Sequence, residues 1–315
     1  MNNSLPTVTV IIAARPDEAE VRAVAAARQL DYPADKMDII VARGKQPSVQ
    51  RNAALRAARG EIIYFLDDDS RPEADLLRRA VEHFKSPEVK MLGGPNLCPP
   101  DASKIEQAFA LTMGSWLSFG PSCARYRAVG SIRSTSEKEL ILCNLLARRD
   151  ALLELGGFNE LLYPNEENAL MDELQKRGGQ LIYDPACFVY RQPRATFLAF
   201  VKMLANYGRG RAEQFRLQPT FGSALNFVPP LFCLYLLALA FLPGLFDWAL
   251  AAYGAAVLLQ TVVLLPAKKL HWVPWIMALT FISHVFYGLG FWRGCLTRPK
   301  PPLPAIAAEV KLEKL

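Results

Sequence analysis

The chain has 315 residues, of which 51% are hydrophobic and 21% are charged, and its mean hydropathy is slightly positive. The net charge of +6 and the pI near 9.0 could suit nucleic acid, but no arginine-rich helix or nucleic-acid motif accompanies the charge, so we expect no nucleic-acid partner. The excess of apolar residues lies after residue 224, a distribution that suits an anionic membrane surface better.

The N-terminal part alternates apolar, strand-like runs with helix-like runs. Strands are expected over 8–14, 37–42 and 61–66, with helices over 17–30 and 47–59. This alternation predicts right-handed βαβ crossovers, and therefore an α/β domain with a mostly parallel sheet and helices on both faces. The absence of a Gly-x-Gly-x-x-Gly motif after the first strand disfavours a dinucleotide-binding fold. Because the first apolar run is only strand-length, we predict no signal peptide and expect this part in the cytoplasm.

The third strand ends in three carboxylates, Asp67, Asp68 and Asp69, followed by Ser70. Ligands of open α/β sheets sit beyond the carboxyl ends of the strands, and three carboxylates there repel one another unless a cation neutralises them. A hard divalent cation together with a diphosphate would do so. The alternative is a solvated loop, or Asp69 or Ser70 capping a helix that begins near Pro72; capping explains one aspartate but not three.

The middle of the chain is less regular. A short strand is expected over 89–93, whereas residues 95–140 show only an amphipathic stretch over 105–116. A helix over 149–155 is followed by Glu166 and Glu167, which precede a helix that extends to residue 177, and by a strand over 180–183. The glutamates are either catalytic carboxylates or simply negative charge at a helix N-terminus, which favours acidic residues.

The C-terminal third is apolar. An amphipathic helix over 196–215 could pack on the domain or lie on a membrane, and the apolar runs that follow favour the membrane. The runs over 225–242 and 248–267 are each long enough to span a bilayer and should form a hairpin. Flanking basic residues place both hairpin ends in the cytoplasm. A third run over 273–292 either crosses against the positive-inside rule or is re-entrant or interfacial; within it, His284 is expected to be a packed residue rather than a ligand.

These features predict four parts. They are a cytoplasmic domain over 1–195, an amphipathic and basic juxtamembrane segment over 196–222, a transmembrane region over 223–292 and a basic tail over 293–315. The cysteines have no metal-ligand spacing and are expected to be free thiols in a reducing compartment: Cys98, Cys123, Cys143, Cys187, Cys233 and Cys295.

Several motifs, in this order, resemble glycosyltransferase family 2, the inverting transferases with a GT-A fold. Residues 9–15 resemble the opening strand of the family, residues 50–63 its second helix and third strand, and Asp67 to Asp69 its Asp-x-Asp position. Residues 156–167 resemble the segment that leads into the catalytic acidic pair, and residues 207–211 the basic motif near the end. With its apolar C-terminal segments, the chain looks most like membrane-associated exopolysaccharide transferases of the succinoglycan-synthesis type.

The resemblance implies roles for individual residues. A Mn or Mg ion would be held by Asp69 with Asp67, and Glu167 would be the catalytic base, with Glu166 a supporting acceptor-site residue. The nucleotide-sugar donor would contact Ala14, Arg15, Arg51, Asn52, Asp67, Asp68, Arg209 and Arg211.

Two positions depart from the family pattern. The second strand ends in Arg43-Gly44-Lys45 where an acidic residue usually contacts the nucleotide base, and the only nearby carboxylate, Asp38, lies inside the strand. The acidic pair is Glu166-Glu167 rather than Glu-Asp, so the base is one methylene longer but chemically the same.

The sequence therefore predicts an inverting, metal-dependent glycosyltransferase of hexosyltransferase type, held in the inner membrane by several passes with its catalytic domain in the cytoplasm. It would move a sugar from a nucleotide-diphosphate sugar to a glycan linked to polyprenyl diphosphate, in surface or extracellular polysaccharide synthesis, among membrane lipids. One alternative acceptor is polyprenyl phosphate itself. A second alternative is a non-catalytic membrane partner that retains the fold.

Overall fold

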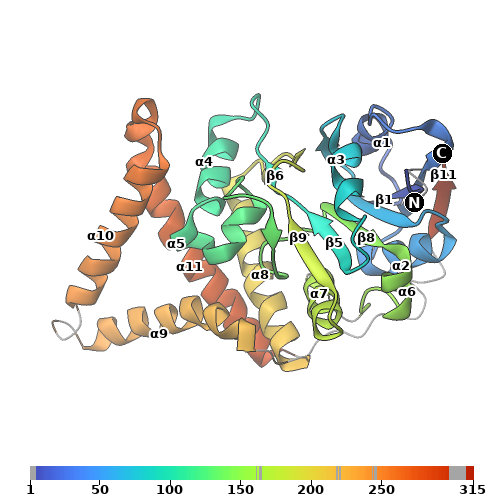
Figure 1. The fold of residues 1–315 in the computed structure, drawn as a ribbon. Coiled ribbons are helices and arrows are strands. Elements are labelled where there is room, and N and C mark those ends of the chain that lie inside the picture. The colour runs from blue at the N-terminus through green and yellow to red at the C-terminus, as the bar shows by residue number, and fades with distance from the viewer. Residues whose placement is uncertain are drawn as a thin grey trace. The chain divides into compact units, whose positions relative to one another are not determined.

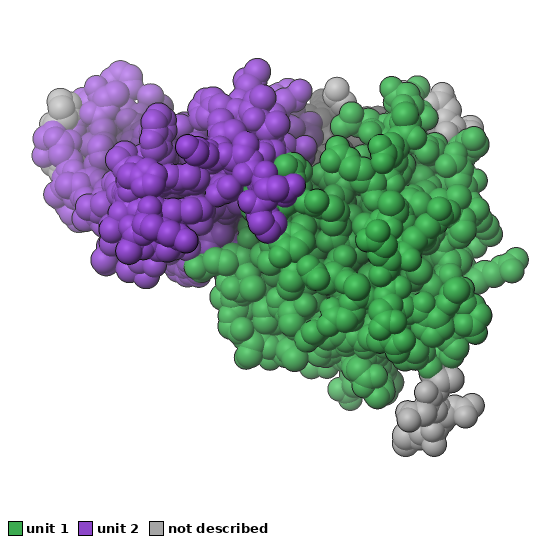
Figure 2. All heavy atoms as spheres, turned by 90° about the horizontal axis from the view of Figure 1, so that it is seen from above, with its two compact units in different colours: residues 1–99, 124–192, 300–315 green, residues 100–123, 193–299 purple. Residues whose placement is uncertain are grey.

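The structure is a computed structural model that describes residues 5–160, 162, 165–217, 219, 221–242, 244, 247–297 and 310–315. Much of the predicted basic tail, residues 298–309, and most of the predicted hairpin turn lie outside these ranges. The chain forms two compact units, residues 1–99, 124–192 and 300–315 in one and residues 100–123 and 193–299 in the other (Figure 2). Residues 100–123, which the sequence analysis places in the first domain, thus belong with the apolar helices.

The first unit is built on a mixed sheet (Figure 1). Among the described residues its strand order is β11-β2-β1-β3-β8-β5-β9-β7. The strands are β1 (Val8–Ala14), β2 (Met37–Arg43), β3 (Ile62–Asp67), β5 (Val89–Gly93), β7 (Arg133–Ser134), β8 (Asn144–Arg148), β9 (Gln180–Tyr183) and β11 (Lys311–Lys314). A second, smaller sheet contains β4 (Arg71–Pro72), β10 (Val189–Tyr190) and β6 (Asn96–Leu97).

The α/β class is confirmed, but the sheet is mixed rather than mostly parallel. Strands β1, β2 and β3 are parallel neighbours, as the sequence predicts, and β5 is parallel to β9. Strand β8 lies antiparallel between β3 and β5, and β7 and β11 also pair antiparallel. Strand β8 follows the irregular stretch that the sequence analysis leaves unassigned, and its central residues Leu145, Leu146 and Ala147 are fully buried.

Helices cover both faces of this sheet, as predicted. Side chains alternate along each strand, so Val8, Val10 and Ile12 of β1 face one core and Ile11 faces the other. The first core is completed by α1 (Arg22–Ala27) and α3 (Leu76–His83). The second is completed by α2 (Pro47–Ala57), α6 (Arg149–Glu154) and α7 (Glu166–Lys176).

The alternative that Asp69 or Ser70 caps a helix near Pro72 is wrong. Helix α3 begins only at Leu76, and its N-cap residue, Asp75, makes no side-chain capping hydrogen bond. Residues 71 and 72 instead form strand β4. The predicted helix over 17–30 is also shorter, because regular helix is confined to α1.

The second unit is helical. Its elements are α4 (Lys104–Met113), α5 (Trp116–Phe119), α8 (Phe197–Leu217), α9 (Val228–Phe241), α10 (Asp247–Leu264) and α11 (Val273–Leu296). Three helical segments of the described chain, residues 224–241, 247–264 and 267–296, are long and apolar enough to cross a membrane. On α9 and α10, large apolar side chains are exposed, among them Leu231, Leu259 and Val263. Such exposure is unusual for a protein surface in water and suits lipid.

The amphipathic helix α8 has its apolar face inside the protein. Phe200, Val201 and Leu204 are buried, and the ring of Phe200 stacks on Phe109 of α4 at a centroid distance of 4.2 Å. The prediction that these residues lie on a membrane surface is therefore corrected. Helices α8 and α11 pack closely, since a Cβ atom at Gly290 would collide with the carbonyl of Ala205.

Helix α11 also holds His284, whose two ring nitrogens lie 2.8 Å from the Tyr253 hydroxyl and 2.8 Å from the Leu117 carbonyl oxygen. These contacts confirm that it is a packed, hydrogen-bonded residue. All six cysteines carry thiols rather than disulfides, again as predicted.

Candidate active site

The aspartates lie in a tight turn at the end of β3 that is held by Ser70. This serine is fully buried, donates its hydroxyl to the carbonyl oxygen of Cys143 at 3.1 Å and accepts from the Asp67 amide at 3.3 Å. The Ser70 amide in turn donates to the Asp67 carbonyl at 3.1 Å. The turn is therefore fixed by its own residues and by β8, the neighbouring strand.

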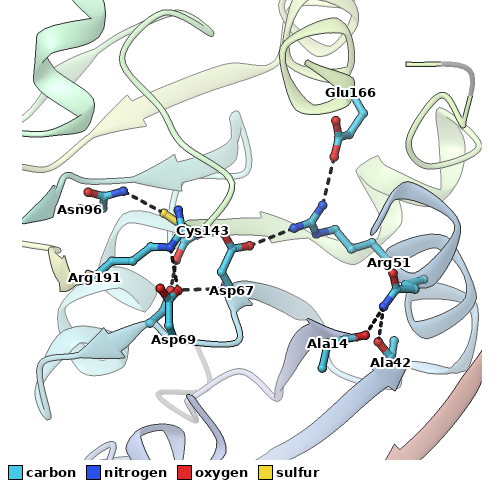
Figure 3. Close-up of polar contacts among 11 residues, drawn as sticks. Ala14, Ala42, Arg51, Asp67, Asp69, Asn96, Cys143, Glu166 and Arg191 are labelled. Carbon is cyan, nitrogen blue, oxygen red and sulfur yellow. Dashed lines mark hydrogen bonds and ion pairs between the residues drawn. The ribbon is translucent and has the colours of Figure 1, made fainter. Parts of the chain in front are cut away.

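Two arginines hold the aspartate side chains (Figure 3). Asp67 contacts Arg51 through one carboxylate oxygen and Arg191 through the other, each at 3.0 Å. Asp69 accepts from Nε of Arg191 at 2.7 Å. Asp68 is partly buried, and this burial raises its pKa, with further contributions from the charges of Asp69 and Asp67. A cluster of this kind favours additional positive charge.

Arg51 connects the aspartate turn to the glutamate pair. Its other terminal nitrogen donates to Glu166 at 3.0 Å, so one guanidinium, with only 7% of its side chain exposed, bridges Asp67 and Glu166 (Figure 3). Glu166 is 2% exposed, and burial raises its pKa to about 8, the charge of Glu167 acting in the same direction and that of Arg51 in the opposite one. Glu167 is partly exposed. The two glutamates are thus unequal, one facing a buried arginine and the other accessible.

Helix α2 anchors the segment that precedes the glutamates. Asn52 donates through Nδ2 to the carbonyl of Phe158 and to Glu160, both at 2.9 Å, and accepts from the Phe158 amide at 2.8 Å. Gly157 has a φ of +83° and lies directly against Asn52, a position with no room for a side chain. Helix α2 therefore supplies both Arg51 and the anchor of this loop.

Comparison with known sequences now identifies the family. The profile described as "Glycosyltransferase like family 2" matches residues 1–207, which is well over half of the chain and includes all the side chains described above. The chain belongs to the glycosyltransferase-like family 2.

Individual relatives of this family 2 glycosyltransferase are distant. It is 25% identical over 179 residues to "Pre-mycofactocin glycosyltransferase" of Mycobacterium tuberculosis, which covers 53% of this chain and 34% of that protein. It is 26% identical over 199 residues to "Succinoglycan biosynthesis protein ExoA" of Rhizobium meliloti, covering 62% of this chain and 58% of the relative. The matches thus span about one third and somewhat over half of these curated relatives.

A solved structure supports the GT-A fold. The mannosyltransferase PcManGT from Pyrobaculum calidifontis, in complex with GDP-Man and Mn²⁺, superimposes with a TM-score of 0.59 at 18% identity, covering 90% of this chain and 87% of that one. At this identity the likeness establishes the fold alone.

Within this glycosyltransferase, four of the predicted site residues are brought together: Arg51, Asp67, Asp69 and Glu166. The side chain of Asn52 instead makes its hydrogen bonds with the 157–160 loop. At the end of β1 the carbonyl of Ala14 accepts from Gln50 at 2.7 Å, and the Arg15 side chain is exposed.

The predicted basic residues Arg209 and Arg211 belong to the helical unit. Arg209 lies 3.7 Å from Glu213, and Arg211 donates to Gln214 at 3.1 Å. The structure also locates the departure from the family pattern at the second strand. Asp38 accepts from the Thr9 hydroxyl inside the sheet, and Arg43 pairs with Glu313 of β11 at 3.1 Å, a carboxylate that comes from the far end of the chain.

Arg191 is the functional side chain that sequence reasoning missed. It follows β10 directly, and its main-chain amide donates to the Leu97 carbonyl at 3.0 Å. The available signal was electrostatic, because three adjacent carboxylates at a strand end require a positive partner that a basic residue after another strand can supply. The strand itself is only two residues long, too short to be recognised from the sequence.

The aspartates suit a Mn or Mg ion chemically. Among the described residues, no three His, Cys, Asp or Glu side chains are placed to hold a metal by themselves. Mg²⁺ sites that include substrate phosphates need only one or two carboxylates, however, and hard oxygen ligands are available here. The guanidinium of Arg191 already lies against Asp67 and Asp69, which shows that the position accepts a cation. We therefore assign Asp69 and Asp67 as the residues that would hold the ion.

Proposed function

We propose that this family 2 glycosyltransferase moves a hexosyl group from a nucleotide-diphosphate sugar to a lipid-linked glycan, with inversion at the anomeric carbon. The observation that carries the proposal is the Arg51 bridge between Asp67 and Glu166. One buried guanidinium contacts both the acidic turn, which is expected to face the donor's diphosphate, and the acidic pair, which is expected to face the acceptor. Sugar transfer needs both, at opposite sides of the sugar.

On the donor side, Asp69 and Asp67 would hold the divalent cation. Without the cation, the negatively charged aspartates would repel the donor's diphosphate. The ion, when bound, supplies charge neutralisation for the leaving diphosphate. The donor and Mn²⁺ bound by the mannosyltransferase that shares the fold support this assignment. Ala14 and Arg15 lie at the end of β1, parallel to the strand that delivers the aspartates, and are proposed to contact the nucleotide.

On the acceptor side, Glu167 is proposed to take the proton from the attacking hydroxyl. It is the accessible member of the pair, whereas Glu166 is buried against Arg51. A base on the face of the sugar opposite the leaving diphosphate gives inversion, because the hydroxyl then attacks in line from that face. Glu166 and Arg51 position the pair without taking the proton themselves.

The membrane is proposed to bring the acceptor to this site. The apolar helices of the second unit expose large side chains such as Leu259 and Val263, as expected of surfaces in contact with lipid. A glycan on polyprenyl diphosphate would present its hydroxyl at the cytoplasmic face of the inner membrane. Arg209 and Arg211 precede the apolar helices and are proposed to bind anionic phosphate groups there.

The test is a donor screen with the full chain purified in detergent. Release of nucleoside diphosphate is measured for a panel of nucleotide sugars with a polyprenyl-diphosphate glycan, with polyprenyl phosphate, and without acceptor. We expect one donor to give release that depends on the glycan lipid. Release with polyprenyl phosphate alone would reassign the acceptor. Absence of release with every donor would instead support a non-catalytic membrane partner.

Membrane topology has its own test. Single cysteines placed at positions 247 and 268 of a cysteine-free chain are exposed to a thiol reagent that cannot cross the inner membrane. Because basic residues flank the hairpin, we expect modification at 247 and protection at 268. The reverse pattern would overturn the proposed orientation.

A further inference from the structure

The guanidinium of Arg191 lies between the two aspartates that are proposed to hold the cation. Its Nη2 is 3.0 Å from Oδ2 of Asp67, and its Nε is 2.7 Å from Oδ1 of Asp69 (Figure 3). These two carboxylates therefore already have a positive partner supplied by the chain itself. An arginine in this position must affect how any other cation binds.

The two arginines of the cluster each pair with two carboxylates but differ in exposure. The guanidinium of Arg51 pairs with Asp67 and Glu166, which belong to two different segments, and 7% of its side chain is exposed. Both ion pairs of Arg191 are with the aspartate turn, and 22% of its side chain is exposed, as is 28% of that of Asp69. Its backbone is tied to Leu97, so its side chain can turn while the strand stays in place.

A guanidinium and a divalent ion compete for these carboxylates. Two positive groups within about 4 Å repel strongly in a partly buried site. Asp67 has its other oxygen paired with Arg51, so an ion held by Asp67 and Asp69 would compete with Arg191 for Oδ2 of Asp67. Arrival of the ion therefore favours departure of the Arg191 head group.

We propose that Arg191 and the metal ion exchange places when the donor binds. Without donor, Arg191 neutralises Asp67 and Asp69; when ion and donor arrive together, its planar fork moves from the carboxylates to the donor's diphosphate. A guanidinium binds phosphate with the same paired geometry that it uses for carboxylate. The inference rests on the proposed function and adds an order to it, since the ion binds with the nucleotide rather than before it.

The exchange predicts effects of opposite sign on two ligands. Mn²⁺ binding to the full chain in detergent is measured by the electron paramagnetic resonance signal of the free ion, first without nucleotide. Arg191→Gln removes the competing charge, so Mn²⁺ should bind about 10- to 100-fold more tightly, the range associated with one charge-assisted hydrogen bond. UDP and GDP are then titrated at saturating Mn²⁺. Whichever of them the parent binds should bind the variant more weakly, because the phosphate loses its arginine.

Two further variants complete the test. Arg191→Lys keeps the charge but not the fork, so its Mn²⁺ affinity should stay near that of the parent while its nucleotide affinity falls. It also carries the test should Arg191→Gln fold poorly. Arg78→Gln breaks an exposed arginine pair with Asp31 that involves none of the three aspartates, and it should change neither affinity.

Equal Mn²⁺ affinity in the parent and Arg191→Gln would overturn the exchange. Loss of both Mn²⁺ and nucleotide binding would also overturn it, since Arg191 would then only support the fold of the turn. If neither protein bound Mn²⁺, with or without nucleotide, the exchange would again be wrong. Sugar transfer itself would still be decided separately by nucleoside diphosphate release.

Discussion

The aspartate turn after β3 and the glutamate pair at the start of α7 are two acidic regions with parallel construction. In each, an arginine holds at least one carboxylate, and a buried polar residue fixes the backbone. They differ in where that support comes from. Ser70 lies inside the aspartate turn, whereas Asn52 and Arg51 reach the glutamate segment from a helix more than 100 residues earlier in the chain.

The region proposed to bind the donor and the region proposed to carry the catalytic base are therefore stabilised in different ways. The backbone of the aspartate turn is fixed by its own serine and by the Cys143 carbonyl, and only its carboxylates depend on distant arginines. The glutamate pair depends on α2 for its position, so its geometry is coupled to the packing of the second core. Substitutions should therefore affect the two regions differently, and the following changes test that expectation.

The largest effect is expected at Glu167. Glu167→Gln keeps size and shape but cannot accept a proton, so turnover should fall by roughly two to four orders of magnitude while donor affinity is retained. Glu167→Asp should recover part of the activity, because the carboxylate is kept. The measurements are nucleoside diphosphate release and donor binding for each variant. Parental turnover in Glu167→Gln combined with an inactive Glu166→Gln would move the base to residue 166.

The next effect concerns the aspartate turn. Asp69→Ala removes a proposed ligand, so Mn²⁺ affinity in the presence of nucleotide should fall by at least the roughly 10- to 100-fold that weaker, outer partners of a metal contribute. Chelation of the parent should abolish turnover, and Mn²⁺ or Mg²⁺ should restore it. Titration calorimetry measures the Mn²⁺ affinity of the variant, and a chelator series measures the metal dependence of turnover in the parent. Full turnover in excess chelator would show that the aspartates do not act through a metal.

A third, smaller effect is expected at the polar residues that support the two regions, Asn52 for the glutamate segment and Ser70 for the aspartate turn. Asn52→Ala leaves the buried Phe158 amide without its acceptor, so the free energy of unfolding should fall by about 1–3 kcal/mol, with a loss of turnover because the glutamate segment loosens. Ser70→Ala should cost about 0.5–1.5 kcal/mol. Chemical denaturation of both variants gives the comparison. A larger loss in Ser70→Ala would mean that the aspartate turn, not the glutamate segment, depends more on its support.

A further effect is a pH dependence at Glu166. Its pKa is raised from 4.5 to about 8 in the folded chain, mainly by burial, so between these values the folded state holds a proton that the unfolded state has lost. The contribution of this group to stability therefore declines as pH rises from about 5 to 8. Glu166→Gln removes the titration, so the stability of the parent relative to the variant should decrease across that range. A constant difference would show that Glu166 is already ionised throughout.

Local signals in the sequence predicted a large part of this structure. Strands β1 and β9 have the predicted bounds, and β3 delivers the aspartates as expected, because each is a short apolar run with clear ends. The family motifs also led to the correct fold and to the residues that meet at Arg51.

What could not be predicted is pairing between distant segments. Strand β8 lies in an apolar run, but nothing local indicates its antiparallel partners, and the two-residue β10 is too short to be recognised. The antiparallel part of the sheet and the approach of Arg191 to Asp67 were therefore both missed. Similarly, nothing around Phe200 distinguishes a face that packs on α4 from one that lies on lipid. In each case the deciding partner is far away in the sequence.

The pairing of β11 with β2 has one more consequence, for the path of the chain. Leu312 lies opposite Ala42 and Glu313 opposite Val41, so the residues after the three long apolar helices return to the sheet from which the chain set out. A strand cannot join a sheet on the other side of a bilayer. Between β10 and β11 the chain must therefore cross the membrane an even number of times. The three long helices cannot all cross it once each. At least one of them, if the others cross, enters or borders the bilayer without traversing it.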